Sequence, residues 1–506
     1  MTSPTTSADR DRHKRLALVA AIMGSVVAGL DATAVNVALP AIRADLGGGL
    51  AGQQWVSNAY LLALGSLILV GGSLGDIFGE RRVYSIGVAG FGIVSVLCAV
   101  APDIGILIAA RALQGAFGAL LMPSALAVII AAFPRDERGA AIGSWTAWSG
   151  IATVIGPLAG GYLVDAASWR LIFAINVPFV VLTLVLVAMA VPGRERGAAH
   201  ARVDWLGAAL TFFGLAGPVL ALIRLPDAGW GSPQVWGSGL GGLALLGFFV
   251  LHERRTLEPA VPLALFRRRN FSVGNVQTLA MYGGLGIMFF LLVLFLQEVA
   301  GYSALRAGLA LMPTTIVMFA LSKRFGKLAD RFGPRLFMGG GPLIAGVGLA
   351  LLLRIGAHVS YLTGLLPPLL IFSVGLAATV APLTAAVLSD ADEGNAGIAS
   401  GINNAVSRVA GLLAVAVLPV IAGLTGKNFY DPAKMVDGFR VAMVACAGLA
   451  AAGGILAWLT ISSKVLEPER EEGAAAPVEP QFSCPVVGTP LRATAEPASR
   501  PNPTVA

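Results

Sequence analysis

Residues 72–81 read GSLGDIFGER and residues 326–335 read GKLADRFGPR, so one ten-residue pattern occurs twice in this chain of 506 residues. Both stretches fit G-x-L-small-D-x-F-G-x-R, and each follows a long apolar segment. Each also comes after the second apolar segment of a set of six, provided that two segments between the sets are an insertion. Parallel repeats of this kind build membrane proteins from two related halves with a site between them. The repeat therefore predicts a fold with two equivalent halves.

The composition indicates that the chain lies in a bilayer. Hydrophobic residues make up 56% of it, charged residues only 12%, and the mean hydropathy is +0.79, whereas soluble domains carry about 25% charged residues. Apolar stretches of about 20 residues recur along the chain without the alternation of barrel strands. We predict an all-α integral membrane protein, with two six-helix bundles related by parallel pseudo-symmetry plus two inserted helices. About fourteen transmembrane helices are expected, near residues 16–40, 55–73, 83–101, 104–132, 140–164, 171–191, 204–225, 235–251, 271–299, 307–321, 336–353, 361–388, 396–424 and 439–463.

The chain is predicted to consist of five segments. Residues 1–15 are expected to form a cytoplasmic N-terminal tail, and residues 16–191 the N-terminal six-helix bundle. Residues 192–270 hold the two inserted helices and their linkers, and residues 271–463 form the C-terminal six-helix bundle. Residues 464–506 are rich in Pro and Glu among small residues and are expected to be a disordered cytoplasmic tail.

The distribution of charge predicts the orientation. With the N-terminus inside, most Arg and Lys residues fall on cytoplasmic loops, as the positive-inside rule requires, so both termini are expected in the cytoplasm. The composition, rich in Ala, Gly and Arg, hints at a bacterial cytoplasmic membrane. The formal net charge of +7 then reflects topology, and no nucleic-acid partner is expected. Cys98, Cys446 and Cys484 are too few and too scattered for a disulfide framework or a metal site. No phosphate-binding G-x-x-x-x-G-K-[ST] loop occurs, so direct use of ATP is not expected. No cofactor, no metal and no enzymatic activity are predicted.

Several motifs in order along the chain resemble the major facilitator superfamily, and within it the fourteen-helix drug:proton antiporter family. Besides the two loop motifs, they are LDATAVNVALP at residues 30–40, RALQGAFGA at 111–119 and WRLIFAINVP at 169–178. The fifth span has the antiporter pattern G-x8-G-x3-G-P-x2-G-G, with Ala152 in place of one glycine; its matching residues are Gly143, Gly156, Pro157, Gly160 and Gly161. The resemblance covers about residues 16–463. It implies a monomeric, proton-coupled exporter of small lipophilic compounds such as drugs or antibiotics, with protons, that substrate and the lipid bilayer as its partners.

Asp31 in the first span and Arg111 in the fourth are charged residues inside apolar runs. A charge in hydrocarbon costs about 2.5–3.5 kcal/mol on insertion scales, so it persists mainly where it pairs, titrates or lines a polar path. From the helical rise, Asp31 lies ~13 Å from Pro40 and Arg111 ~10 Å from the outer start of its span. Both therefore sit at similar depth and can pair if their helices touch. The resemblance implies that they take part in proton coupling; a purely structural ion pair is the alternative.

The two loop motifs are expected to act as a gate. An acid beside a helix start can accept backbone N–H bonds and pair with a neighbouring arginine. In the family this loop latches the two halves in the outward-facing state, and the alternative is a helix cap alone. Ile77 and Glu80 replace residues that are usually basic in the motif. The gating residues are Gly72, Asp76, Gly79, Arg81, Gly326, Asp330, Gly333 and Arg335.

A polar stripe on the thirteenth span is expected to line the substrate path together with Gln114 of the fourth. Its members are Ser400, Asn403, Asn404, Ser407 and Arg408, spaced i, i+3, i+4, i+7 and i+8. Such a face on an otherwise apolar helix turns into the bundle or a water-filled cavity. Arg408 has no obvious acidic partner, so it could hold an anionic or carbonyl-bearing substrate, or a helix C-terminus.

Two other functions remain open from the sequence. The same machinery could carry an endogenous metabolite or lipid in a proton-linked manner. Alternatively, the protein could be a membrane scaffold or sensor that has lost transport, against which the retained Asp31 and Arg111 argue.

Overall fold

The computed structural model describes most of the chain up to Ile461. The described residues are 7–190, 203–256, 259, 261–389, 396–424, 428–429 and 431–461. Their regular structure is helical throughout, without a β-strand. The expected C-terminal tail, residues 464–506, and residues 191–202 of the first linker lie outside the described residues.

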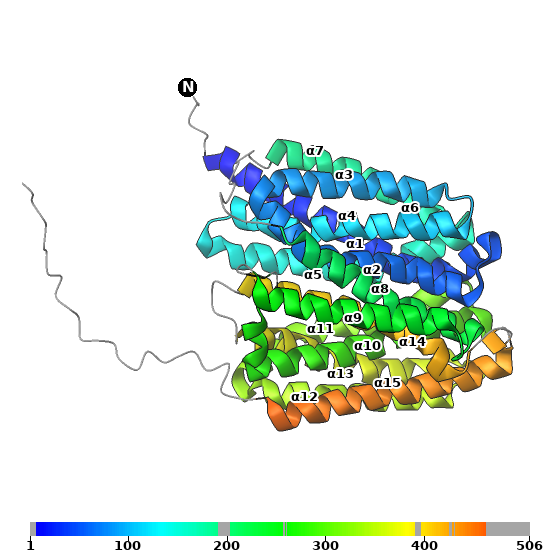
Figure 1. The fold of residues 1–506 in the computed structure, drawn as a ribbon. Helices are drawn as coiled ribbons and strands as arrows, with labels where there is room; N and C mark the ends of the chain where they lie inside the picture. Colours follow the sequence, from blue (N-terminus) through cyan, green and yellow to red (C-terminus); the bar gives the residue numbers. More distant parts are fainter. Residues whose placement is uncertain are drawn as a thin grey trace, which may run out of the picture. The chain divides into compact units, whose positions relative to one another are not determined.

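The first half has six long helical segments, of which the sixth is interrupted at Ile175. The two inserted helices follow it. These helices are α1 (Ser7–Leu46), α2 (Gly49–Phe78), α3 (Glu80–Ala99), α4 (Ile104–Ala132), α5 (Arg135–Ala166), α6 (Leu171–Ala174), α7 (Asn176–Ala190), α8 (Trp205–Ala228) and α9 (Pro233–Arg255) (Figure 1).

The second half also has six long segments and contains three short non-α turns. Its elements are η1 (Leu263–Arg267), α10 (Arg269–Glu298), α11 (Ala304–Phe332), α12 (Pro334–Leu351), η2 (Leu352–Arg354), η3 (Tyr361–Leu365), α13 (Leu366–Ser389), α14 (Ala396–Ala422) and α15 (Pro432–Thr460).

The described chain has fifteen α-helices, and since α6 and α7 share one span they make fourteen spans. Thirteen of these described spans are long and apolar enough to cross a membrane. The fourteenth, α5, begins with the charged sequence RDER and is rich in Gly and Ala. The predicted all-α integral membrane fold with about fourteen transmembrane helices is confirmed.

The two halves pack by one scheme. In the first half α2 and α3 pack on α4, and α1 packs on α5 and α7; in the second half α11 and α12 pack on α13, and α10 packs on α14 and α15. The helices correspond one to one in chain order, as a parallel repeat requires. The halves meet along two seams, α5 with α11 and α2 with α14, which are themselves equivalent under the repeat. The inserted α8 packs on both α2 and α14, and α9 packs on α8.

The repeated loop has the same backbone conformation in both halves. Gly79 has φ +88° and Gly333 has φ +83°, and each lies between the second and third helices of its half. Their backbone N–H groups bond to Gly75 O and Ala329 O, both at 2.9 Å. Only glycine adopts this region of φ without strain, which explains why the motif has glycine at both positions.

Two helix ends differ from the sequence expectation. The helix α1 begins at Ser7, within the expected N-terminal tail, and continues through Pro40 to Leu46, where fully buried Ile42 packs in the core. The helix α15 begins at Pro432 rather than near residue 439. Asp431 caps it by accepting from Ala433 N at 2.9 Å, and proline is favoured at the first helical position. Asp431 and Pro432 therefore mark the start of α15, which hydropathy alone does not predict.

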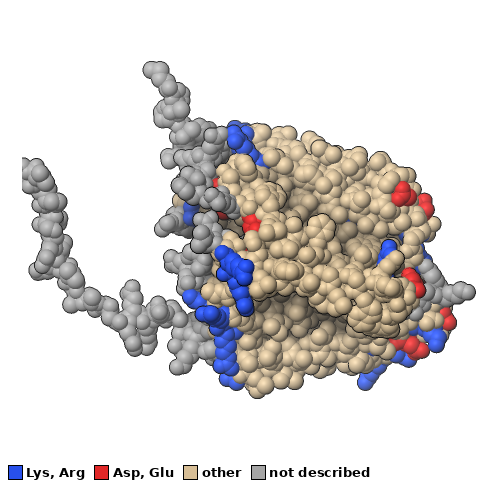
Figure 2. Space-filling view, in the orientation of Figure 1, with Lys and Arg blue, Asp and Glu red and all other residues tan. Residues whose placement is uncertain are grey.

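Charge distinguishes the two ends of the helical bundle. One end, called the basic end here, bears the exposed residues Arg82, Arg254, Arg255, Lys323, Arg324 and Arg335. Figure 2 shows Lys and Arg gathered at this end and almost uncharged surface along the middle. The other end, called the far end, carries the α1–α2, α5–α6 and α10–α11 turns and charges of both signs. An uncharged middle between charged ends is the surface expected of a membrane-spanning bundle.

Candidate functional site

Asp31 of α1 and Arg111 of α4 form a completely buried ion pair. Arg111 Nη1 lies 2.5 Å from Asp31 Oδ2, and the two residues are 0% and 1% exposed. Breaking such a pair on one side leaves an uncompensated buried charge and costs about 3–5 kcal/mol. The structure thus brings together the two charged residues whose depth in the membrane, estimated from the helical rise, was predicted to be similar.

Neutral side chains complete the hydrogen bonding of this pair. Gln114 Nε2 donates to Asp31 Oδ1 at 3.1 Å and to Ser95 Oγ at 2.9 Å, while its Oε1 accepts from Arg111 at 2.6 Å. Asn176 Nδ2 also donates to Asp31 Oδ1 at 3.1 Å. Gln114 therefore belongs to the carboxylate network and does not line the cavity, contrary to its expected place on the substrate path. We call Asp31, Arg111, Gln114, Ser95 and Asn176 the carboxylate network.

Sequence reasoning did not select Ser95 or Asn176. Both are 0% exposed, and they lie in mainly apolar stretches of the helices α3 and α7. A polar residue in an apolar stretch was the available signal, because a buried polar group needs a hydrogen-bond partner.

Tyr60 of α2 lies between the carboxylate network and the interior cavity. Its ring centroid is 4.3 Å from Arg111 Cζ, within the range of a cation–π interaction. Its hydroxyl is buried and has no hydrogen-bond partner in the part of the chain that the structure describes. Arg111 and Tyr60 both line the cavity, whereas Asp31 does not. A ligand in the cavity would therefore meet the guanidinium, with the carboxylate behind it.

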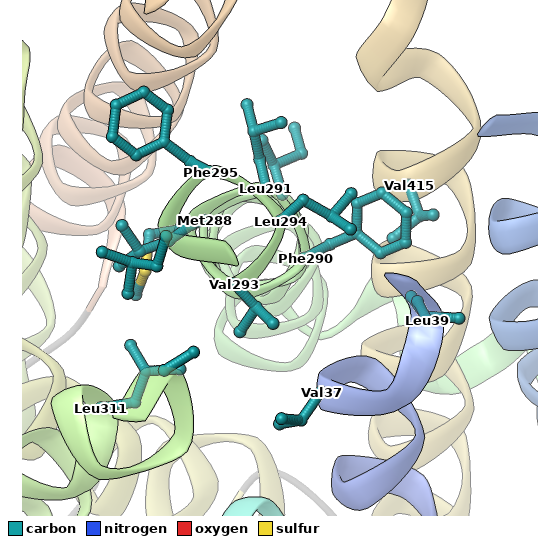
Figure 3. Packing of buried hydrophobic residues seen from close by; sticks show 14 of the residues in the cluster. Val37, Leu39, Met288, Phe290, Leu291, Val293, Leu294, Phe295, Leu311 and Val415 are labelled. Atoms are coloured by element: carbon teal, nitrogen blue, oxygen red, sulfur yellow. The ribbon is translucent and has the colours of Figure 1, made fainter. Parts of the chain in front are cut away.

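A cavity of about 460 Å³ lies between the two halves. Its apolar wall comes mainly from α10 and α11, and its polar wall includes residues of α1, α2 and α14. Figure 3 shows Phe290 and Val293 of α10 directed toward Val415 of α14 and Val37 of α1, and all four line the cavity. This volume falls within the ~300–1,000 Å³ typical of small-molecule sites.

The polar stripe of α14 is divided between two environments. Asn404, Ser407 and Arg408 line the cavity. Asn403 turns instead to α10, where its Nδ2 donates to Thr278 Oγ1 at 2.8 Å and Asn275 Oδ1 at 3.2 Å. Ser400 is not among the residues that line the cavity. Three of the five predicted residues therefore border this space.

The α5 glycines pack against two different helices. A Cβ on Gly156 would lie 2.9 Å from Leu30 O of α1, and one on Gly160 would lie 2.8 Å from Ala34 Cβ. On the other face, a Cβ on Gly161 would lie 2.7 Å from Ala304 O of α11. Pro157 O comes within 2.5 Å of a Cβ built on Gly308 of α11. Gly143, by contrast, faces open space, so the antiporter pattern includes one glycine without a packing role here.

Hydrogen bonds and ion pairs join described residues of the two halves toward the far end. Asp165, at the end of α5, accepts from the backbone N–H groups of Ala304 at 3.1 Å and Leu305 at 2.9 Å. Arg43 of α1 pairs with Glu298 of α10 at 2.8 Å. Asp165 thus caps the first turn of α11 from the opposite half, and these contacts join the two halves at the far end. The role of Asp165 is not predictable from the sequence alone, because an acid at a helix end resembles an ordinary loop residue.

The loop arginines contact the last helix of their own half. Arg81 Nη2 donates to Ala188 O of α7 at 3.4 Å, and Arg335 Nε donates to Trp458 O of α15 at 2.5 Å. The two carbonyls occupy equivalent places in the repeat. Gly72 packs toward Pro123 of α4, as Gly326 does toward Ala381 of α13.

Within the described ranges of the chain, the two loop acids neither pair with the loop arginines nor cap the following helix, contrary to the prediction from the sequence. Asp76 and Asp330 are exposed, and neither forms a hydrogen bond or ion pair with another described residue. The arginines expected to pair with them extend toward the last helices instead. No helix-capping bond of either acid is present among the described residues.

The chain matches the family model of the Major Facilitator Superfamily over residues 21–415, and it belongs to this family of membrane transporters. It is 34% identical over 483 residues to the puromycin resistance protein of Streptomyces alboniger, which covers 92% of this chain and 95% of that protein. It is 35% identical over 422 residues to the tetracenomycin C resistance and export protein of Streptomyces glaucescens, with 82% and 77% covered. The predicted family is confirmed, and the chain is a transporter rather than an enzyme.

A solved structure of a bacterial homologue of the human lysosomal transporter Spinster has the same fold. It was determined in an inward-facing, unoccupied conformation, and superposes with a TM-score of 0.66 at 16% identity over 90% of this chain and 98% of that one. This likeness confirms the two-bundle fold at the level of the backbone.

Proposed function

We propose that this protein is a proton-coupled exporter of small lipophilic compounds, antibiotics among them, in a bacterial cytoplasmic membrane. The observation that carries the proposal is the buried Asp31–Arg111 pair beside a cavity between the two halves. Relatives named for puromycin and tetracenomycin C resistance share about a third of its residues over most of its length, which supports export of such compounds.

The carboxylate network accounts for coupling as follows. A proton on Asp31 removes the negative charge that holds Arg111, so the guanidinium becomes available to the cavity it lines. When Asp31 loses the proton, the Asp31–Arg111 pair forms again, and the guanidinium is no longer available to the cavity. If the cavity opens alternately to each side, one proton moves inward each time a substrate is carried outward. Movement of this proton charge across the membrane contributes about 2.3 kcal/mol per 100 mV of membrane potential.

The distribution of charge supports an orientation with the basic end in the cytoplasm. Both termini then lie in the cytoplasm, and we propose that the contacts of Asp165 and the Arg43–Glu298 pair form a seal that faces outward. We propose that the structure represents the inward-facing state. In the same proposal the loop motifs act as the cytoplasmic gate, with Arg81 and Arg335 fixing the loops to α7 and α15. The protein is proposed to act as a monomer. Its proposed segments are the N-terminal tail, the first bundle, the inserted helices, the second bundle and the C-terminal tail, at residues 1–15, 16–191, 192–270, 271–463 and 464–506.

The proposal is tested in inverted membrane vesicles that hold an acid interior. Addition of tetracenomycin C is expected to release protons from vesicles containing the protein and to concentrate the compound inside. Vesicles from cells without the protein are the control. Accumulation of a compound without proton release would contradict proton coupling, and the absence of both signals would favour the scaffold or sensor function.

Asp165→Ala is expected to loosen the outward seal. The variant loses both bonds to the first turn of α11, and loss of a helix cap costs about 0.5–2 kcal/mol. Distances between spin labels on Val100→Cys and His358→Cys, which are exposed at the far end of each half, should include a longer population. Asp227→Ala, at an exposed acid of α8, is the matched control. An unchanged distance distribution in Asp165→Ala would show that the cap does not hold the halves together.

A further inference from the structure

The cavity wall has an unbalanced positive charge. Among the described residues that line it, Arg111 and Arg408 are charged and no Asp or Glu is present. Arg111 is neutralised by Asp31 at 2.5 Å. Arg408 forms no hydrogen bond or ion pair with any other residue of the described chain, and its Nε is buried without a partner. The electrostatic potential inside the cavity is therefore positive on the α14 side.

Arg408 is held in place by the close approach of two helices. A Cβ built on Gly65 of α2 would lie 3.2 Å from Arg408 Cβ, so any larger residue would push α14 away. Gly65 and Arg408 belong to the seam between the halves, where α2 packs on α14. The stem of the arginine is thus fixed on the scaffold, and its guanidinium is free to bind a ligand.

The remaining lining makes the cavity amphiphilic. Asn404 and Ser407 lie beside Arg408 on the same face of α14, and the cavity is completed by Phe289 and Phe290 of α10 and Met312 of α11. Aromatic and thioether side chains accept a flat apolar body. A guanidinium fork between an amide and a hydroxyl matches the oxygens of a carboxylate, sulfonate or ionised phenol.

We infer that the cavity selects amphiphilic organic anions, with an aromatic or apolar body against α10 and α11 and one acidic group on Arg408. This inference rests on the proposed export function and narrows its substrate class. A lipophilic cation would meet no carboxylate in the wall, because Asp31 is shielded behind Arg111. A bound anion would supply the counter-charge that Arg408 lacks within the low-dielectric interior.

The experiment compares two probes that differ by one charge. 1-Anilinonaphthalene-8-sulfonate and N-phenyl-1-naphthylamine share one aromatic body, and only the first bears a sulfonate. Binding of each is measured by equilibrium dialysis with the purified full-length protein in an uncharged detergent, corrected with a detergent blank. We expect the wild type to bind the sulfonate about tenfold or more tightly than the neutral probe, as charge-assisted hydrogen bonds give.

Substitutions assign this preference to one residue. Arg408→Gln and Arg408→Met should lose the preference, whereas Arg408→Lys should keep most of it. Arg354→Gln, at an exposed arginine that ends η2, is the matched control and should bind like the wild type. A wild type without preference, or a folded Arg408→Gln or Arg408→Met that retains it, overturns the inference. Dialysis uses no proton gradient, so a failure of proton coupling in vesicles leaves this result unchanged.

Discussion

Asp31→Asn is expected to abolish proton-driven export and to reduce efflux to passive leakage. Asparagine preserves the shape of the side chain and one acceptor for Arg111, but it cannot bind and release a proton. Because Asp31 is fully buried and bonds to Arg111, Gln114 and Asn176, no neighbouring carboxylate of the network can replace it. The measurement is substrate-dependent proton release from inverted vesicles, with the amount of inserted protein quantified in the same preparation.

Two further variants separate the titrating role from the structural one. Asp31→Glu keeps an acid and should retain part of the coupling despite its extra methylene. The double variant Asp31→Asn with Arg111→Gln removes both charges, so it should recover thermal stability lost by the single variant without regaining coupling. Efflux that still follows the pH gradient in Asp31→Asn would mean that the pair is only structural.

Gly161→Val is expected to open the outward seal and to shift the conformational equilibrium. A Cβ at this position would already lie 2.7 Å from Ala304 O and 2.7 Å from Leu305 Cα, so α5 and α11 must separate. Overpacking of this kind costs about 1–3 kcal/mol, which corresponds to a shift of about fivefold to about 140-fold between inward- and outward-facing states.

A thiol in the cavity reports this shift. Thr315 lines the cavity, so Thr315→Cys in a background without the three native cysteines should react faster with a membrane-impermeant maleimide added outside. Gly143→Val is the control, since it lies on the same helix and nothing lies within 4 Å of its built Cβ. Equal labelling rates in the two glycine variants would mean that the α5–α11 contact does not close the outer side.

The sequence could predict those features that depend on composition, period and repetition. Hydropathy and the duplicated loop predicted the membrane fold and its parallel repeat, because each span needs its own apolar length. Depth from helical rise predicted that Asp31 and Arg111 could meet. The α14 stripe was predicted as a face, but spacing along one helix does not say which neighbour each residue meets. Asn403 therefore turned to α10, while Asn404 and Arg408 reached the cavity.

Other features depend on contacts between segments far apart in the chain. Ser95 and Asn176 gain their meaning only when α3 and α7 pack beside α1, and Asp165 only when α5 meets the start of α11. The expected pairing of Asp76 with Arg81 failed because a backbone carbonyl of α7 lies within reach of that arginine. Such competition between partners is set by tertiary packing and leaves no periodic signal.

The hairpin of α8 and α9 makes the two flanks of the protein unequal. It occupies the junction of α2 with α14, so hydrocarbon chains are kept from that side of the molecule. On the opposite flank α5 and α11 adjoin the bilayer without such a cover. A lipophilic compound dissolved in the membrane would therefore meet two unlike flanks of the protein, one covered by this hairpin and one not.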